Sequence, residues 1–172
     1  MYNNTVITIG RQYGSGGREI GKRISELLGI SYYDDELISM AAKNSGLSHD
    51  VLSDVDEKAT NSLLYTLAMS GSLFGGNAAM AYEMPINDKL YIAQSEVIKS
   101  LAEKESCVII GRCADYVLKD YPSAINLFIY ADLDKRAERV AIAKGITEAK
   151  AKDLIIKTDK QRANYYNYYT SQ

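Results

Sequence analysis

The chain has 172 residues, of which 47% are apolar and 24% charged, and its formal net charge is −2. This length and composition predict one globular domain with an ordinary core, which excludes a fusion of two enzymes, a disordered segment and a fibre. The charge provides no overall basic field for duplex nucleic acid, so any anion site must be local.

The scarcity of histidine and cysteine excludes further classes. One histidine and two cysteines cannot supply the four ligands of a structural zinc site. We interpret His49, which follows an N-capping Ser48, as an exposed first-turn residue rather than a catalytic base. Cys107 opens an apolar run and no disulfide framework is expected, so we expect a reducing compartment. Without a basic leader or an apolar run of ~20 residues, a cytoplasmic protein is expected.

The first elements form a strand, a glycine loop and a helix. Residues 5–9 are a β-branched run, and residues 10–17 contain four glycines. Apolar residues then recur at helical spacing until Gly29, a typical C-cap. A second short strand is predicted over 31–33, so the acidic Asp34 stands at a strand end.

The middle of the chain is predicted to be helical with one interruption. Residues 35–45 and 48–59 have helical patterns, whereas the Gly-, Ala- and Met-rich stretch 61–86 has no clean period, and we expect mobility there. Apolar residues from Leu90 to Leu101 mark a further helix.

The last third of the chain alternates strands and helices. A buried-type strand over 107–110 precedes the turn Gly111-Arg112 and a helix through residue 118, and a second strand is predicted over 124–130. Asp132 is the predicted cap of the next helix, and a long helix follows over 147–169. Alternating apolar strands and helices predict an α/β fold, a parallel sheet covered on both faces, with ligands beyond the carboxyl ends of its strands.

The glycine loop, residues 10–18, has the pattern of a phosphate site. A glycine loop between a strand and a helix surrounds an anion with N–H groups and the positive end of the helix. The Walker pattern G-x-x-x-x-G-K-[ST] is not matched, because aligning Gly14-Ser15-Gly16 places Gly17 in the lysine position. Arg18 and Lys22 are the candidates for the missing cation.

A dinucleotide site is the rival interpretation of this loop. Asp34 lies 20 residues after Gly14, where a ribose-binding acid would stand. However, a G-x-G-x-x-G pattern begun at Gly14 would need glycine in place of Glu19, and no Tyr-x-x-x-Lys pair is present. We therefore favour phosphate binding without a dinucleotide.

The arginines point to several phosphates at one site. Seven arginines stand against thirteen lysines, and six of them fall at loops, strand ends or late helices, namely Arg11, Arg18, Arg112, Arg136, Arg139 and Arg162. The planar guanidinium binds phosphate oxygens bidentately. Phosphoryl transfer between nucleotides needs such an array, because its catalysis consists mostly of positioning and electrostatic stabilisation. Closing arginines over the site would also exclude water.

Four segments resemble the cytidylate kinase-like proteins, relatives of the P-loop nucleoside monophosphate kinases. They are residues 9–20 (IGRQYGSGGREI), 32–34 (YYD), 108–116 (VIIGRCADY) and 159–166 (DKQRANYY). The resemblance implies a three-layer α/β/α P-loop NTPase fold with a helical lid, as a single domain over 1–172. The core would cover about 1–131 and the lid with its flanking helices about 132–172. Kinases of this fold also carry a later strand and helix, which leaves open that these are missing after residue 172.

The resemblance also assigns roles. It implies an ATP- and Mg²⁺-dependent kinase for a nucleoside monophosphate, CMP or dCMP. The donor phosphates would contact Gly10, Arg11, Gly14, Ser15, Gly16, Gly17, Arg18 and Glu19, with Ser15 or Glu19 helping to hold Mg²⁺. The acceptor side would contain Asp34, Arg112, Asp115 and Asp159. The catalytic cations would be Arg18, Arg112, Arg136, Arg139 and Arg162.

Several alternatives stay open. Because Gly17 replaces the loop lysine, the chain could be a nucleotide-binding regulatory module without kinase activity, and a kinase for a non-nucleotide small molecule is a third hypothesis. The partners expected are small-molecule nucleotides, with neither nucleic acid nor membrane among them, and a homodimer is left open. Tyrosines at 165, 166, 168 and 169 are interpreted as packing against a further segment or a partner chain rather than as base-stacking groups.

Overall fold

The computed structural model describes residues 4–45 and 85–172, which form a parallel sheet flanked by helices. The order of its strands is β2-β3-β1-β4, and all neighbours pair in parallel. The strands are β1 (Val6–Arg11), β2 (Ser31–Tyr33), β3 (Cys107–Ile110) and β4 (Ala124–Ile129). The central strand β1 pairs Val6 with Cys107 of β3 and with Ala124 of β4. The predicted parallel α/β sheet is confirmed.

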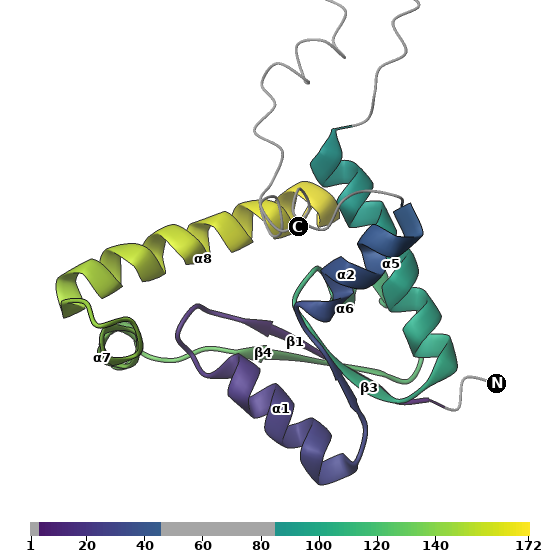
Figure 1. The fold of residues 1–172 in the computed structure, drawn as a ribbon, viewed down its shortest axis with the longest axis horizontal. Coiled ribbons are helices and arrows are strands. Elements are labelled where there is room, and N and C mark those ends of the chain that lie inside the picture. The colour runs from purple at the N-terminus through teal and green to yellow at the C-terminus, as the bar shows by residue number, and fades with distance from the viewer. Residues whose placement is uncertain (1–3, 46–84) are drawn as a thin grey trace, which may run out of the picture.

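Helices lie on both sides of this sheet. They are α1 (Gly17–Leu28), α2 (Glu36–Ser45), α5 (Ile86–Lys104), α6 (Ala114–Val117), α7 (Leu133–Lys144) and α8 (Glu148–Thr170). In Figure 1, α1 lies on one side of the sheet and α2, α5 and α6 on the other, while α8 runs from α7 across to α5. The predicted helix over 48–59, His49 and almost all of the stretch 61–86 lie outside the described residues. Within the described part of the chain, no helix is both long and apolar enough to span a membrane.

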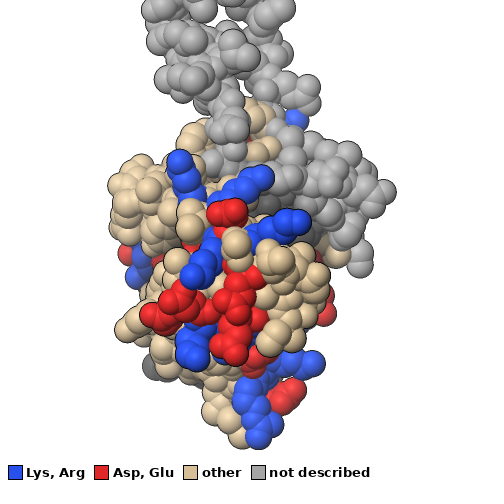
Figure 2. Space-filling model, turned by 90° about the vertical axis from the view of Figure 1, so that its left-hand side faces the viewer, with Lys and Arg blue, Asp and Glu red and all other residues tan. Residues whose placement is uncertain are grey.

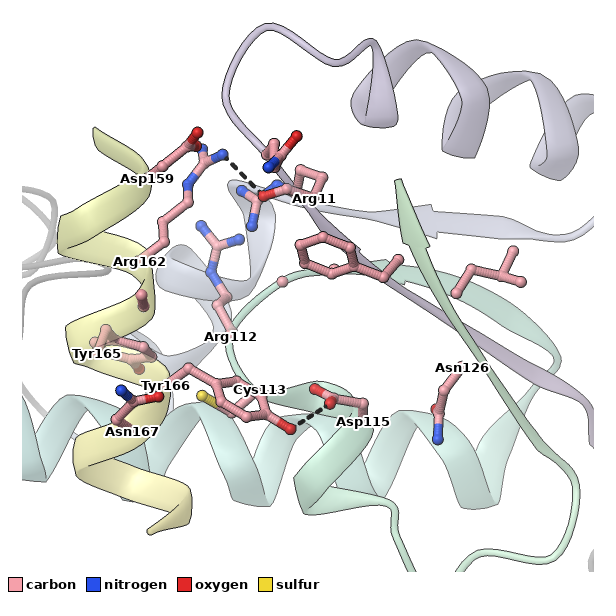
Figure 3. A pocket seen from close by; sticks show the side chains of 16 residues that line it. Arg11, Arg112, Cys113, Asp115, Asn126, Asp159, Arg162, Tyr165, Tyr166 and Asn167 are labelled. Carbon is pink, nitrogen blue, oxygen red and sulfur yellow. Dashed lines mark hydrogen bonds between the residues drawn. The ribbon is translucent and has the colours of Figure 1, made fainter. Parts of the chain in front are cut away.

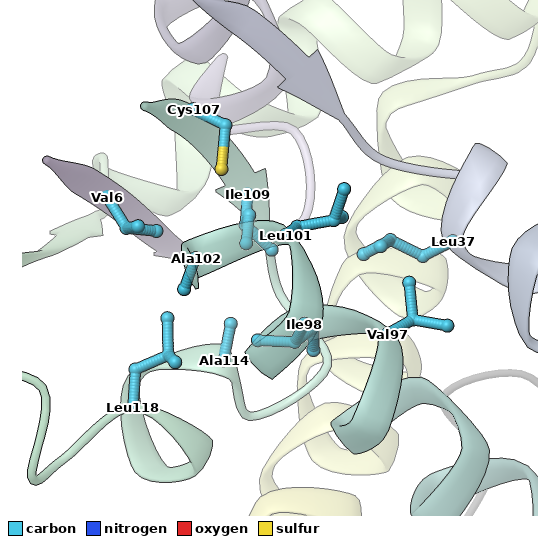
Figure 4. Packing of buried hydrophobic residues seen from close by; sticks show 10 residues of the cluster. All are labelled: Val6, Leu37, Val97, Ile98, Leu101, Ala102, Cys107, Ile109, Ala114 and Leu118. Atoms are coloured by element: carbon cyan, nitrogen blue, oxygen red, sulfur yellow. The ribbon is translucent and has the colours of Figure 1, made fainter. Parts of the chain in front are cut away.

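Each side of the sheet has its own apolar core, because successive strand residues point to opposite faces. Toward α1, a cluster forms around Ile7, Ile9 and Ile110. Toward the other side, Figure 4 shows α5 packing against the sheet and α6, with Ile98 and Cys107 among the fully buried residues. Burying a side chain of this size contributes about 1.5–3 kcal/mol to folding. These two clusters hold the carboxyl ends of β1 and β3 side by side.

The edge strand β4 departs from the expectation of a sheet covered on both faces. Ile125 and Phe128 are 48% and 63% exposed. The helices α1, α5 and α6 pack mainly on β1, β2 and β3, and β4 contributes its two end residues, Ala124 and Ile129, to the core clusters. The residues between these ends are exposed, so β4 is not the buried strand that its apolar composition predicted.

The C-terminal tyrosines pack inside the chain. Tyr169 stacks on Tyr91 of α5 with ring centroids 4.0 Å apart, and Tyr165 meets both rings edge-on. The Tyr169 hydroxyl donates to Asp88 of α5 (2.8 Å), and the Tyr166 hydroxyl donates to Asp115 of α6 (2.7 Å). Within the described residues these tyrosines pack against α5 and α6, and their packing against a further segment or a partner chain stays a prediction.

The charges on the outer face of α7 and α8 are mixed. Figure 2 shows acidic and basic side chains interspersed on the face at the α7 end of the molecule. Lys152 of α8 pairs there with Asp134 of α7 (2.5 Å), and Lys135 pairs with Glu138 (3.6 Å). This face therefore presents no continuous basic surface.

Candidate active site

The glycine loop makes a tight turn between β1 and α1. Gly14 and Gly16 have φ values of +75° and +85°, a region that side chains with a Cβ rarely adopt. At Gly14 a Cβ would also lie 2.7 Å from Val140 Cγ2 of α7. The Ser15 hydroxyl donates to the Gln12 carbonyl (2.9 Å), so this buried side chain closes the loop on itself. The loop is thus shaped by its own hydrogen bonds and by the contact with α7.

Two arginines of α7 bind the loop from outside. The buried Arg136 donates from Nη1 to the Tyr13 carbonyl (3.1 Å) and to Asp159 Oδ2 of α8 (2.6 Å), and from Nε to the Ala131 carbonyl (2.9 Å). Arg139 donates to the Gly14 carbonyl (3.1 Å). Asp159 Oδ1 in turn accepts from the Tyr13 N–H (2.7 Å). Helix α7 is therefore bound to the loop through two loop carbonyl groups, and α8 through the Tyr13 N–H.

A cavity of about 430 Å³ opens around this loop, which we call the loop cavity. It is lined by Gly14, Gly16 and Gly17 and by the first turn of α1, including Arg18 and Glu19. Across it stand Arg139 and Arg162 of the covering helices. Backbone N–H groups at a helix start, together with flanking guanidinium groups, suit an anion such as phosphate.

A second cavity of about 630 Å³, the strand-end cavity, lies beyond the carboxyl ends of β1, β3 and β4 under α8. Figure 3 shows the guanidinium groups of Arg11, Arg112 and Arg162 gathered at one end of it. Asp115 and Asn126 stand toward the other end. The strand-end cavity thus has a cationic end and a neutral-to-acidic end, as a phosphorylated small molecule would require.

The side chain of Arg112 is held in place by an ion pair with the buried Asp34 and by a hydrogen bond to a backbone carbonyl. Its Nη1 donates to Asp34 Oδ1 at the end of β2 (3.2 Å) and to the Ile110 carbonyl (3.1 Å). Asp34 also binds Arg18 Nε (2.7 Å), and Arg18 reaches the exposed Asp35 as well (2.8 Å). Burial opposes the charge of Arg18, but these two carboxylates more than offset it and raise the pKa of its guanidinium. Asp34 lines neither cavity, and its contacts make it a positioning group for Arg112.

Two tyrosines near the site remain protonated. Burial and the hydrogen bond to Asp115 raise the pKa of Tyr166, which lines the strand-end cavity. Burial, followed by the charge of Asp34, raises the pKa of Tyr32 to about 12. Neither phenol is therefore an ionised base at neutral pH, and Tyr166 is available as a polar lining group.

The predicted site residues fall into four groups. Those that line the loop cavity are Gly14, Gly16, Gly17, Arg18, Glu19 and Arg139. Those that line the strand-end cavity are Gly10, Arg112, Asp115 and Asp159. Arg11 and Arg162 line both. Those that line neither are Ser15, Asp34 and Arg136, whose polar atoms contact other protein groups.

Several lining residues were missed by the sequence analysis, chiefly Gln12, Asn126, Phe128 and Tyr166. Asn126 offered a signal, because it is a lone amide inside an apolar strand. Its Oδ1 accepts from the Thr8 hydroxyl across the β1–β4 pair (2.7 Å). The sequence did not mark Phe128 or Gln12 in this way, because their place in the cavity depends on how β4 pairs with β1 and on the conformation of the glycine loop.

The donors suit a magnesium ion that arrives with a nucleotide. Within residues 4–45 and 85–172, no group of three or more His, Cys, Asp and Glu is arranged to hold a metal by itself. Mg²⁺ is usually held by one or two carboxylates together with phosphate oxygens and water. Glu19 places one carboxylate in the loop cavity and fits this pattern, whereas the Ser15 hydroxyl is directed into the loop.

Solved structures resemble this arrangement of strands, loop and covering helices. An uncharacterized protein from Eubacterium ventriosum is 29% identical, with a TM-score of 0.69 over 98% of this chain and 80% of that chain. A shikimate kinase from Bacteroides thetaiotaomicron has the same fold at 16% identity, with a TM-score of 0.51 over 95% of this chain and 81% of that one. No curated protein matches.

The molecule therefore has a three-layer α/β/α fold with a glycine loop between β1 and α1, the fold that the shikimate kinase also has. A family model described as the cytidylate kinase-like family matches residues 6–172. The chain belongs to the cytidylate kinase-like family, and the resemblance found in the sequence is confirmed.

Proposed function

We propose that the protein is a cytoplasmic, ATP-dependent kinase that phosphorylates a nucleoside monophosphate, CMP or dCMP. The observation that carries this proposal is the junction of two cavities. The loop cavity and the strand-end cavity share Arg11, Gln12 and Arg162 as lining residues. A phosphoryl group passing from a donor in one to an acceptor in the other would meet both guanidinium groups.

The donor triphosphate is assigned to the loop cavity. The N–H groups of residues 14–18 and the positive end of α1 would bind its phosphates. Mg²⁺, held on the protein side by Glu19, would neutralise charge on the donor oxygens when bound. Arg139, which lines this cavity and donates to the Gly14 carbonyl, would cover the phosphates from α7.

The acceptor is assigned to the strand-end cavity. Its phosphate would bind Arg112, whose side chain is buried and fixed by Asp34. The nucleoside would extend toward Asp115, Asn126 and Tyr166, which provide carboxylate, amide and hydroxyl groups for a base or sugar. Cytosine as the base is supported by the family alone.

The transfer itself needs positioning and charge stabilisation. An oxygen of the acceptor phosphate forms a bond to the γ-phosphorus of ATP, and the bond from that phosphorus to the β,γ-bridging oxygen breaks. The bridging oxygen leaves on ADP with the bonding electrons, and the acceptor becomes a nucleoside diphosphate. Arg11 and Arg162 would stabilise the negative charge on the transferred oxygens. Helix α8 over the junction would exclude water.

The test is acceptor-dependent formation of ADP. The purified protein is incubated with Mg-ATP and CMP, dCMP, UMP or AMP, with Arg112→Ala as the site variant and Arg23→Ala as its matched control. Arg23 lies on α1 with an exposed side chain paired to Glu26. We expect one acceptor to stimulate ADP formation and Arg112→Ala to reduce turnover on the order of 10²-fold. Background ADP with every acceptor, while ATP still binds, would refute the proposal and favour a binding module or a non-nucleotide acceptor.

A further inference from the structure

The glycine in the lysine position has a structural cause. A Cβ placed on Gly17 would lie 2.7 Å from Arg11 Cβ, 3.2 Å from Arg11 Cγ and 3.4 Å from Ile129 Cβ. The nearest of these atoms belong to the stem of Arg11, next to the backbone of β1, and cannot swing aside as a flexible side-chain end would. The stem of Arg11 and a side chain at position 17 therefore compete for the same space.

Arg11 stands at an unusual place for an arginine. It is the last residue of β1 and is only 8% exposed. By strand alternation it follows Ile7 and Ile9, which face the apolar core beneath α1. Arg11 lines both cavities, so its side chain extends into the space where anions would bind.

The surroundings of Arg11 also favour an anion. Figure 3 shows its guanidinium beside those of Arg112 and Arg162. Arg162 further donates to the Arg11 carbonyl (3.4 Å), which keeps α8 close to the end of β1. Guanidinium groups that converge on one end of a cavity can bind several oxygens of one phosphate group.

The two cations first considered for this role are placed differently. Arg18 is engaged by Asp34 and Asp35 at 2.7 and 2.8 Å. Lys22 lines neither cavity, one turn further along α1. Of the three candidates, Arg11 alone lines the junction where donor and acceptor would meet.

We propose that Arg11 is the substitute for the missing loop lysine, a phosphate-binding cation that comes from the strand before the loop instead of the helix after it. Arg11 binds the terminal phosphates of a nucleoside triphosphate, and Gly17 is required because Arg11 occupies its side-chain space. The binding claim stands by itself. Only its extension to phosphoryl transfer rests on the function proposed above.

An exchange of the two positions tests this proposal. The proteins compared are wild type, Arg11→Ala, Arg11→Gly, Gly17→Lys, the double variant Arg11→Gly/Gly17→Lys and the exposed-arginine control Arg23→Ala. Folding is followed by thermal unfolding, Mg-ATP binding by calorimetry without acceptor, and turnover with the best acceptor. We expect Arg11→Ala to weaken Mg-ATP binding at least ~10-fold and to lower turnover on the order of 10²-fold.

The exchange variants give the sharper result. Gly17→Lys alone should lower the melting temperature, because its stem clashes with that of Arg11. Arg11→Gly removes the Cβ that would lie 2.7 Å away as well as the Cγ, so the double variant should melt above Gly17→Lys and bind Mg-ATP at least ~10-fold more tightly than Arg11→Gly. A folded double variant that binds no better than Arg11→Gly overturns the proposal. If the double variant does not fold, the comparison of Arg11→Ala with wild type decides.

The two proposals fail in different ways. Mg-ATP binding that depends on Arg11, without transfer to any acceptor, refutes the kinase function and retains the role of Arg11. Wild-type binding and turnover in Arg11→Ala overturns the role of Arg11 and retains the kinase. A wild-type protein that binds no Mg-ATP overturns both.

Discussion

Two adjacent aspartates pair with the same two arginines, so a comparison of the two tests how burial changes the contribution of an ion pair to the free energy of unfolding. Asp34 and Asp35 both contact Arg18 and Arg112. The side chain of Asp34 is 10% exposed and that of Asp35 is 67% exposed. Substituting asparagine at either position keeps the shape and removes one negative charge.

The expected costs differ severalfold. Removing one partner of a buried ion pair typically costs about 3–5 kcal/mol, because the remaining charge stays buried. For Asp34→Asn we expect about 2–3 kcal/mol, since Arg112 retains the Ile110 carbonyl and the half-exposed Arg18 can be hydrated. For Asp35→Asn we expect less than about 1 kcal/mol, as for exposed ion pairs.

Urea unfolding at 25 °C measures both values, with the slope m checked for equality among the three proteins. The larger loss should also appear as a fall in melting temperature of about 4–12 °C, from about 2–4 °C per kcal/mol for a chain of this size. Equal losses for the two variants, or a larger loss at Asp35, would refute the assignment of Asp34 as the buried anchor of Arg112.

Three further predictions concern groups away from the cavities. Hydrogen bonds from Ser31 and from the Tyr33 hydroxyl (2.9 Å) lower the pKa of Glu105. The ionised carboxylate therefore stabilises the fold at pH values above the ordinary pKa of glutamate, and this stabilisation is lost as the pH falls through the lowered pKa. Tyr33→Phe should raise that pKa, and an unchanged carboxyl titration by NMR would contradict this. Asp132 accepts from the Asp134 N–H (2.9 Å) as the N-cap of α7, so Asp132→Ala should cost about 1 kcal/mol in urea unfolding, and no loss would argue against the cap. Burial raises the pKa of the Cys107 thiol to about 12, so at pH 8 it should react with a disulfide reagent only after unfolding, and rapid labelling of the native protein would count against its burial.

The sequence was most informative where local patterns determine structure. The strand Cys107–Ile110 and the cap at Asp132 match their predictions, because an apolar run and an N-capping side chain are local signals. The helix α8 begins at Glu148 after the N-cap Thr147, close to the predicted boundary. The family could likewise be recognised from the sequence, since its motifs are continuous.

The sequence was least informative about the direction of side chains. Arg136 and Arg139 stand three residues apart on α7, yet Arg139 lines the loop cavity while Arg136 is buried against Tyr13 and Asp159. Which arginine faces a ligand depends on how α7 packs on the loop, and no local pattern records that packing. The stacking of Tyr169 on Tyr91 joins helices that are far apart in the chain and was unpredictable for the same reason.

The carboxylate of Asp159 joins the loop to the covering helices, because its two oxygens bind the Tyr13 N–H and Arg136. Any change of loop geometry therefore alters the packing of α7 on α8, and any displacement of α8 alters the loop. In thermodynamic terms the two are linked equilibria, and their coupling is reciprocal. On the proposed function, an anion in the loop cavity that favours the packing of α7 on α8 would be bound more tightly, by the same factor, when these helices are packed.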